Sequence, residues 1–441
     1  MYTRDEAERL CAKILSYSTL PECEVELTAT EEYYTRFANN GITTAGFAER
    51  RTAVIRSTRD GKTGKIQTGE MDDRALKASV KRTEDLAAIA PADPEHQPPL
   101  GRQQYPEIHE FDERTANARA PEMIPQIGAL VKIAGSKKLV AAGLFERSHT
   151  TTAVANKAGL FGYSRSADSR LSTTIRMPDG SSSGWAGHPS LRIADISGEA
   201  LANQASEKCL RWRNPKRLDP GAYTVVLEPT AAGDIVRLIA RGLDARATEE
   251  GRTFLSRKGG GTLTGETLFP EFVTLRSDPF SSRQSAVPWT SELLPQHPVS
   301  WVQNGVAKNT FYTRYWAART GKSATPFPGA LVLDGSEAST EDLIRSVNRG
   351  LLVTHFWYIR FVNPQTLQHT GLTRDGVFLI ENGKIAEPVM NFRFNDSPVE
   401  LLKNTKKLGR PERVRGLEGG EMVAPAILAS NFHFTSVSDA V

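Results

Sequence analysis

Apolar residues at helical spacing and short alternating runs divide the first half of the chain into helices and strands. Residues 3–15 show the spacing of an amphipathic helix, with Thr3 as the predicted N-cap. Strand patterns follow at 23–27, 52–57 and 65–68, and the pair Asp60 and Gly61 predicts the turn between the last two. Asp72 is the predicted N-cap of a helix whose apolar positions are Leu76, Val80 and Leu86. Strands covered by helices on this scale are typical of an α+β layer domain.

A second set of elements completes this part of the chain. We predict helices over 122–134 and 193–210 and strands over 138–147 and 171–177. The stretch 213–221 contains Pro215, Pro220 and Gly221, which end a helix and favour a connection between domains. We therefore expect a domain boundary near residue 216, with an N-terminal domain of residues 1–215 and a C-terminal domain of residues 216–441.

Short apolar runs dominate the second half. A strand at 223–227 precedes a predicted helix from Asp234 to about Ala245, with Asp234 as its N-cap. Ser339 is the predicted start of one further helix, over 339–349. The remaining predicted strands are punctuated by Gly, Pro and Asp, which is typical of a closed or rolled antiparallel sheet: 272–275, 301–306, 330–333, 351–361, 376–380, 384–389 and 426–434.

Composition narrows the class of protein. The 441 residues are 39% hydrophobic and 24% charged, which suits a globular protein of two or three domains. The 55 Lys and Arg against 51 Asp and Glu give a net charge of only +4, so direct nucleic-acid binding is not expected. Three scattered cysteines indicate reduced, buried thiols. Neither a signal core nor an apolar run long enough for a bilayer is found, and we expect a cytoplasmic protein without membrane contact.

The most informative segment is a hairpin at 373–389. An apolar run at 377–380 meets the turn pair Asn382 and Gly383 and continues into a second run that ends at Val389. The sequence of this segment resembles the C-terminal signature of the TldD/PmbA family, the modulator of DNA gyrase proteins. It reads Thr-Arg-Asp-Gly-Val-Phe-Leu-Ile-Glu-Asn-Gly-Lys-Ile-Ala-Glu-Pro-Val. Further resemblances follow in order: Arg-Phe-Ala-Asn-Asn-Gly-Ile at 36–42, the segment 304–319, and the segment 328–350.

This resemblance implies a fold and a chemistry. It implies an α+β chain with an N-terminal α/β layer domain followed by a β-rich, barrel-like C-terminal domain, and dimers with a cavity between the subunits. Catalytic members of the family are zinc-dependent peptidases with the pattern His-Glu-x-x-x-His on a helix and a cysteine near the C-terminus. Two imidazoles one helical turn apart share the metal, and the glutamate accepts a proton from the bound water.

The residues that correspond to this zinc motif have changed together. The helix after the strand at 223–227 carries Arg237, Leu238, Arg241 and Gly242, and the approximate position of the cysteine falls near Gly416. A guanidinium group has no lone pair to donate, and leucine and glycine have no donor at all. We therefore predict no catalytic residue, metal or cofactor in this chain, which resembles the PmbA/TldE type of the family.

Other candidate sites are weaker. His355, His369 and His433 could bind zinc only if they converged, and His355 in its apolar run is more typical of a core or a cavity wall. We keep His355, Trp357 and Tyr315 as residues that could line the cavity of the family. His188 is predicted to lie in a surface loop at 184–189. The glycines at 259–261 lack the Lys-Ser/Thr of a phosphate-binding loop and indicate a turn.

Three hypotheses follow. In the first, the chain is a non-catalytic subunit that forms a heterodimer with a TldD-like zinc peptidase and helps to enclose peptide or unfolded-protein substrates. In the second, it is a self-sufficient metallopeptidase with an unrecognised metal site. In the third, it is a homodimeric binding or scaffold protein. Metal content separates the second hypothesis from the others, and the identity of the partner separates the first from the third.

Overall fold

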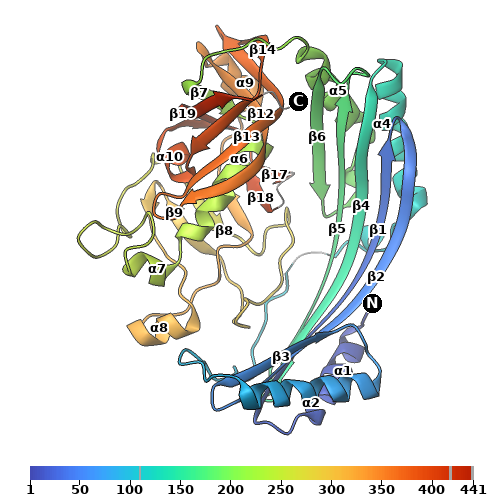
Figure 1. The fold of residues 1–441 in the computed structure, drawn as a ribbon, viewed down its shortest axis with the longest axis vertical. Helices are drawn as coiled ribbons and strands as arrows, with labels where there is room; N and C mark the ends of the chain where they lie inside the picture. Colours follow the sequence, from blue (N-terminus) through green and yellow to red (C-terminus); the bar gives the residue numbers. More distant parts are fainter. Residues whose placement is uncertain (109–110, 417–419, 439–441) are drawn as a thin grey trace.

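A long, curved antiparallel sheet with helices on one side forms the N-terminal part of the molecule (Figure 1). The computed structural model describes residues 1–108, 111–416 and 420–438. The strand order in this sheet is β3-β2-β1-β4-β5-β6. Its elements are α1 Arg4–Tyr17, β1 Glu22–Ala38, β2 Gly41–Arg59, β3 Lys62–Thr68, α2 Asp73–Ile89, α3 Glu113–Asn117, α4 Ala120–Ser136, β4 Val140–Asn156, β5 Phe161–Arg176, β6 Ser183–Ser190, a 3₁₀ turn Ile193–Asp195 and α5 Gly198–Arg211.

The rest of the described chain builds a barrel and a second sheet. Strands β12, β7, β19, β15 and β13 follow one another, and pairing of β12 with β13 closes them into a five-stranded barrel. The second sheet has the order β10-β9-β8-β11-β18-β17. The elements up to α8 are β7 Gly221–Leu227, α6 Pro229–Val236, a 3₁₀ helix Arg237–Gly242, α7 Ala245–Glu249, β8 Leu275–Ser277, β9 Val299–Gln303, β10 Val306–Ala307 and α8 Arg314–Thr320. Those that follow are β11 Leu331–Leu333, α9 Thr340–Arg345, β12 Arg349–Asn363, β13 Gln368–Glu381, β14 Lys384–Val389, β15 Phe392–Asp396, α10 Pro398–Lys403, β16 Thr405–Leu408, β17 Glu412–Arg415, β18 Glu421–Ala424 and β19 Ile427–Val437.

The two faces of the N-terminal sheet differ because side chains alternate along each strand. In β1, Val25 and Leu27 pack on α1 and α2, and Phe37 packs with α4, so all these helices cover one face. The residues between them point to the opposite face and are almost all polar: Glu24, Glu26, Thr28, Thr30, Glu32, Tyr34 and Arg36. One face of the sheet therefore packs into the hydrophobic core, and the other is polar enough to face solvent.

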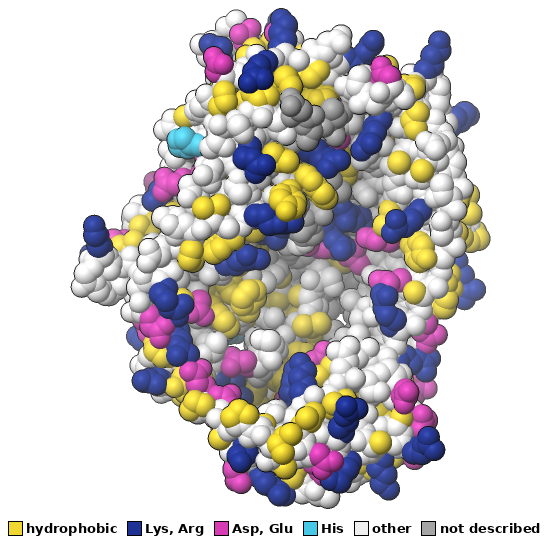
Figure 2. All heavy atoms as spheres, in the orientation of Figure 1, with side chains coloured by type: hydrophobic (Ala, Val, Ile, Leu, Met, Phe, Trp, Pro, Cys, Tyr) yellow, Lys and Arg dark blue, Asp and Glu magenta, His cyan; other side chains and the backbone are white. Residues whose placement is uncertain are grey.

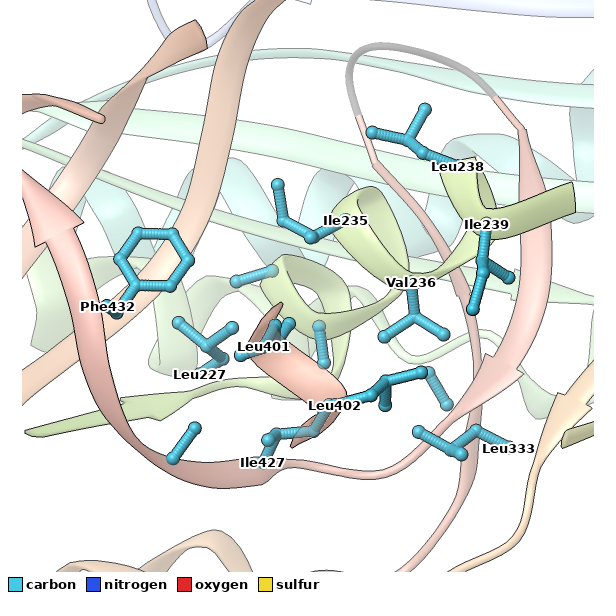
Figure 3. Packing of buried hydrophobic residues seen from close by; sticks show 14 of the residues in the cluster. Leu227, Ile235, Val236, Leu238, Ile239, Leu333, Leu401, Leu402, Ile427 and Phe432 are labelled. Carbon is cyan, nitrogen blue, oxygen red and sulfur yellow. The ribbon is translucent and has the colours of Figure 1, made fainter. Parts of the chain in front are cut away.

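The barrel core is continuous with the buried side of α6 and of the 3₁₀ helix that follows it. Val236 and Ile239 are fully buried, and Figure 3 shows them beside residues of β7, α10 and β19. The labelled partners in this cluster include Leu227, Leu401, Leu402 and Ile427. This packing fixes the helix that follows β7 against the barrel. The predicted fold class, an α+β chain with a barrel-like C-terminal domain, is thus confirmed.

Several local predictions are confirmed by the structure. Thr3 forms a capping box with Glu6 at the start of α1, and the Asp72 side chain caps α2. Ser339 caps α9, which ends earlier than expected, at Arg345. Asn382 and Gly383 both have positive φ, at 50° and 74°, as the tight turn between β13 and β14 requires.

Several predictions are wrong in detail. The strand expected at 272–275 is β8, Leu275–Ser277, and the strand expected over 301–306 is divided into β9 and β10 by a turn. The helix expected to begin at Asp234 begins at Pro229, because proline is favoured in the first turn, and Asp234 lies inside it. The helix expected over 193–210 is divided into the 3₁₀ turn Ile193–Asp195 and helix α5, and Ser197 is the N-cap of α5. The loop expected at 184–189 is strand β6. As an edge strand β6 tolerates Pro189, which a central strand would not.

A buried polar seam joins the two domains at β6 and α5. The Ser183 hydroxyl donates to Asp375 of β13, and the Nε2 atom of His355 lies 3.3 Å from the same carboxylate. The Trp185 ring contacts the His355 ring, with 5.1 Å between centroids. On the α5 side, Trp212 Nε1 donates to the Val389 carbonyl at 2.8 Å. Ser183 and Trp212 therefore form hydrogen bonds across the seam, whereas His355 and Asp375 lie on the neighbouring strands β12 and β13 of the barrel.

The close contact between β6 and α5 should be sensitive to a single methyl group. A Cβ at Gly184 would overlap the Ala205 carbonyl oxygen, whereas a Cβ at Gly128, exposed on α4, would meet nothing within 4 Å. We expect Gly184→Ala to lower the free energy of unfolding by about 1–3 kcal/mol, and Gly128→Ala to raise it by about 0.5–1 kcal/mol. Urea denaturation followed by circular dichroism measures both. Equal stability of the two variants would contradict the packing described.

His355 should make stability depend on pH. Burial lowers its pKa to about 4, whereas an unfolded histidine titrates near 6.5. Between these values the unfolded chain takes up a proton that the folded chain does not, so the free energy of unfolding falls as the pH is lowered, by up to about 3 kcal/mol. We expect His355→Gln to reduce this slope.

Urea denaturation of wild type and variant at pH 7, 5.5 and 4.5 measures the difference in slope, independently of any loss of stability common to all pH values. His297→Gln is the matched control, because His297 is an exposed histidine outside the seam. Parallel curves for His355→Gln and wild type would show that His355 does not titrate as described.

Candidate functional site

The polar face of the N-terminal sheet and the C-terminal domain enclose a hollow. Figure 2 shows this hollow near the middle of the molecule, with Lys and Arg side chains gathered around its upper rim. A cavity of about 340 Å³ lies between the sheet and β17. Its lining includes Glu32, Tyr34, Arg36, Glu146, Asp168 and Arg415. Alternation along β1, β4 and β5 brings the first five of these side chains to the same face, and β17 contributes Arg415 from the opposite side.

The β17–β18 hairpin lies against α6 and against Arg237, the first of the predicted zinc-motif positions. Gly416 follows β17 and lies directly against the carboxylate of Asp234 in α6, and Gly420 lies against the Arg237 side chain. The Nη2 group of Arg170, in β5, donates hydrogen bonds to the carbonyl oxygens of Arg415, at 3.1 Å, and Gly416, at 3.3 Å. The helix end and the start of the hairpin tip are therefore neighbours in space, although about 180 residues separate them.

The residues at this place do not fit a zinc ion. Arg237 offers a permanent cation, and Leu238 is apolar and buried. Gly242 has no side chain, and a Cβ there would press on Phe254 and Leu367. A cysteine at 416 would displace the Asp234 carboxylate. Over residues 1–108, 111–416 and 420–438, no group of three or more His, Cys, Asp or Glu side chains is arranged to hold a metal.

An ion network ties the hairpin to the sheet beside the cavity. Arg413 of β17 pairs with Asp168 of β5 and donates through Nε to Glu421 of β18, at 2.5 Å. Burial raises the pKa of Asp168 to about 6, and the Arg413 guanidinium offsets part of this rise. Burial also lowers the pKa of Arg170, and the positive charge of the nearby Arg415 lowers it further. The upper end of the cavity is thus rich in arginine and partly shielded from water.

Sequence reasoning missed this arginine cluster. The available signal was the alternation Arg413-Val-Arg415, which places two cations on one side of a strand, and the pair Asp168 and Arg170 with the same spacing. Neither pattern identifies its partner strand, because β5 and β17 lie far apart in sequence.

The residues predicted to line a cavity are not brought together. The His355 side chain is wholly buried in the seam. Trp357 is partly buried, with the Arg374 guanidinium 5.0 Å from its ring centre. Tyr315 lies in α8, at the end of the C-terminal domain away from β12 (Figure 1), where its hydroxyl accepts from Arg319 at 2.9 Å.

The other histidines are also accounted for. His369 is buried, with Nδ1 2.6 Å from the Leu367 carbonyl, and His433 lies 3.4 Å from Asp396. His188 is on the surface as expected, but in strand β6. Arg241 is exposed at the end of the 3₁₀ helix. In the described chain no helix has both the length and the hydropathy needed to cross a membrane.

Comparison with known proteins agrees with this architecture. The protein is similar to TldE from Thermococcus kodakarensis, with a TM-score of 0.83 and 18% identity over 97% of this chain and 99% of that one. It is also similar to a candidate modulator of a DNA gyrase from Thermotoga maritima, with a TM-score of 0.82 and 18% identity over 97% and 100% of the two chains. A candidate modulator of DNA gyrase from Bacteroides thetaiotaomicron gives a TM-score of 0.82 and 18% identity over 99% and 100%.

These structural likenesses show the fold. A search of curated protein sequences finds no match. Residues 220–436 match the family model of the PmbA/TldA metallopeptidase C-terminal domain, which covers the barrel, the helix at 229–242 and the β17–β18 hairpin. By this match residues 220–436 form a C-terminal domain of the TldD/PmbA family, and the structural likenesses show that the fold is shared over nearly the whole chain.

Proposed function

We propose that this chain is a non-catalytic subunit of the family, which holds peptide or unfolded-protein substrates while a zinc-bearing partner cleaves them. The observation that carries the proposal is the chemistry of the helix end, where Arg237, Leu238 and Gly242 stand at the positions expected for zinc ligands. The expected cysteine is likewise replaced by Gly416, which lies against Asp234 of the same helix. Guanidinium, alkyl and glycine positions give Zn²⁺ no donor.

The hollow supports the binding half of the proposal. Its floor is the polar face of a sheet, with hydroxyl groups such as Thr30 and Thr150, whose oxygens lie 3.2 Å apart. Hydroxyl groups both donate and accept hydrogen bonds, so they suit the repeating N–H and C=O groups of an extended peptide. A surface of this kind recognises the backbone of many sequences, as an accessory subunit of a peptidase requires.

The alternatives have less support. A self-sufficient metallopeptidase would need another donor group, and His355, His369 and His433 are held by different partners in the described chain. A homodimeric scaffold protein would use the same hollow without a catalytic partner. These two alternatives and our proposal differ in metal content and in the effect of a partner, and both are measurable.

Reconstitution tests the proposal. We expect the purified chain to bind zinc only far below one ion per chain and to leave a fluorogenic peptide library uncut, because its helix offers no ligands. Addition of a His-Glu-x-x-x-His paralogue from the same genome should give co-elution on size exclusion and an increase in peptide cleavage. Metal analysis, gel filtration and cleavage rate are the three measurements.

The control replaces the glutamate of the paralogue's motif with glutamine, which should abolish cleavage while leaving co-elution intact. One zinc ion per chain in the isolated protein, with cleavage that a chelator removes, would establish the self-sufficient peptidase instead. A stable homodimer that ignores the paralogue would favour the scaffold protein.

A further inference from the structure

Two arginines of the cavity have their guanidinium groups available. Arg36 lies on the hollow-facing side of β1, and no carboxylate of the described residues forms an ion pair with it. Arg415 ends β17 and faces the same cavity, with its nearest carboxylate oxygen, in Glu146, 3.9 Å from Nη1. That separation is too long for a hydrogen bond. Among the described residues, Arg36 therefore has no ion-pair partner in this cavity, and Arg415 has only the distant carboxylate of Glu146.

The acidic residues of the cavity are engaged elsewhere. Glu32 forms an ion pair with Arg50 of the neighbouring strand β2, and Asp168 forms one with Arg413. These partners neutralise the charges of Glu32 and Asp168. Of the lining residues named above, the charges that remain are the cations Arg36 and Arg415 and the single carboxylate of Glu146. The local balance favours an incoming anion, and the planar guanidinium fork matches a carboxylate in particular.

We propose that the cavity between β1, β4 and β17 binds the carboxylate group of an extended peptide, with Arg36 and Arg415 as its donors. This inference rests on the proposed function and names the part of the peptide that is recognised. The Tyr34 side chain lies in the same lining and offers a further hydroxyl donor. The remainder of the peptide would follow the hydroxyl-bearing residues along the polar face, among them Thr28 and Thr30.

The carboxylate could come from a peptide C-terminus or from an acidic side chain, and three probes distinguish these sources. Each is pentaalanine with an N-terminal fluorescein: one has a free C-terminal carboxylate, one is amidated, and one is amidated with a central glutamate. Fluorescence anisotropy with the full-length protein gives the dissociation constants. We expect the free-acid probe to bind at least about tenfold more tightly than the plain amide.

Variants locate the effect. Arg36→Gln or Arg415→Gln should bring the free-acid probe to the level of the amide, at unchanged thermal midpoint. Arg59→Gln is the matched control, because Arg59 is an exposed arginine at the far end of β2. Tight binding of the glutamate amide would identify side-chain carboxylates as ligands as well.

Equal binding of free acid and plain amide, a loss of the preference in Arg59→Gln, or no binding of any probe would overturn the carboxylate site. Each of these outcomes is independent of the reconstitution with the paralogue. Cleavage in the mixture without a carboxylate preference would retain the accessory function and remove only this inference.

Discussion

The docking of β6 and α5 on the barrel is the constraint on which the rest of the structure depends. Ser183 and Trp212 are buried at this seam, and their polar groups bond to Asp375 and to the Val389 carbonyl of the C-terminal domain. Lys208 of α5 likewise donates to Glu228 at 2.6 Å. Separating the domains would leave these groups without their partners, which is costly for buried polar atoms in particular. The seam therefore fixes the distance between the N-terminal sheet and the C-terminal domain, and with it the width of the hollow.

The seam also determines what can lie at the hairpin. Because the sheet is held close, Arg170 reaches the backbone carbonyls at 415 and 416, and Asp168 reaches Arg413. Gly416 then lies so close to Asp234 that no larger residue fits without moving the carboxylate. The end of the helix is thus surrounded by arginine side chains and backbone carbonyls. A single histidine placed on the helix would still have these groups as its neighbours.

The sequence predicted most of the local structure and little of its assembly. Capping residues such as Thr3, Asp72 and Ser339 act over a few residues, so their patterns suffice, and the turn at Asn382 and Gly383 is equally local. Strand β6 was missed because Gly184 and Pro189 are typical of loops, and only its position at a sheet edge and against α5 makes a strand of it. The arginine cluster was missed because Arg170 and Arg413 meet only through tertiary packing.

The hollow persists for a physical reason that does not depend on a metal. Closing it would press the polar face of β1, with Glu32 and Arg36, against the C-terminal domain and would remove these charges from water. Unless each charge finds a partner, its desolvation costs more free energy than the burial of the few apolar atoms on this face could return. The alternation that buries Val25 and Leu27 beneath the helices thus also keeps the opposite face wet. A chamber that is kept open by its own polar wall has room for an extended peptide whether or not a metal is bound nearby.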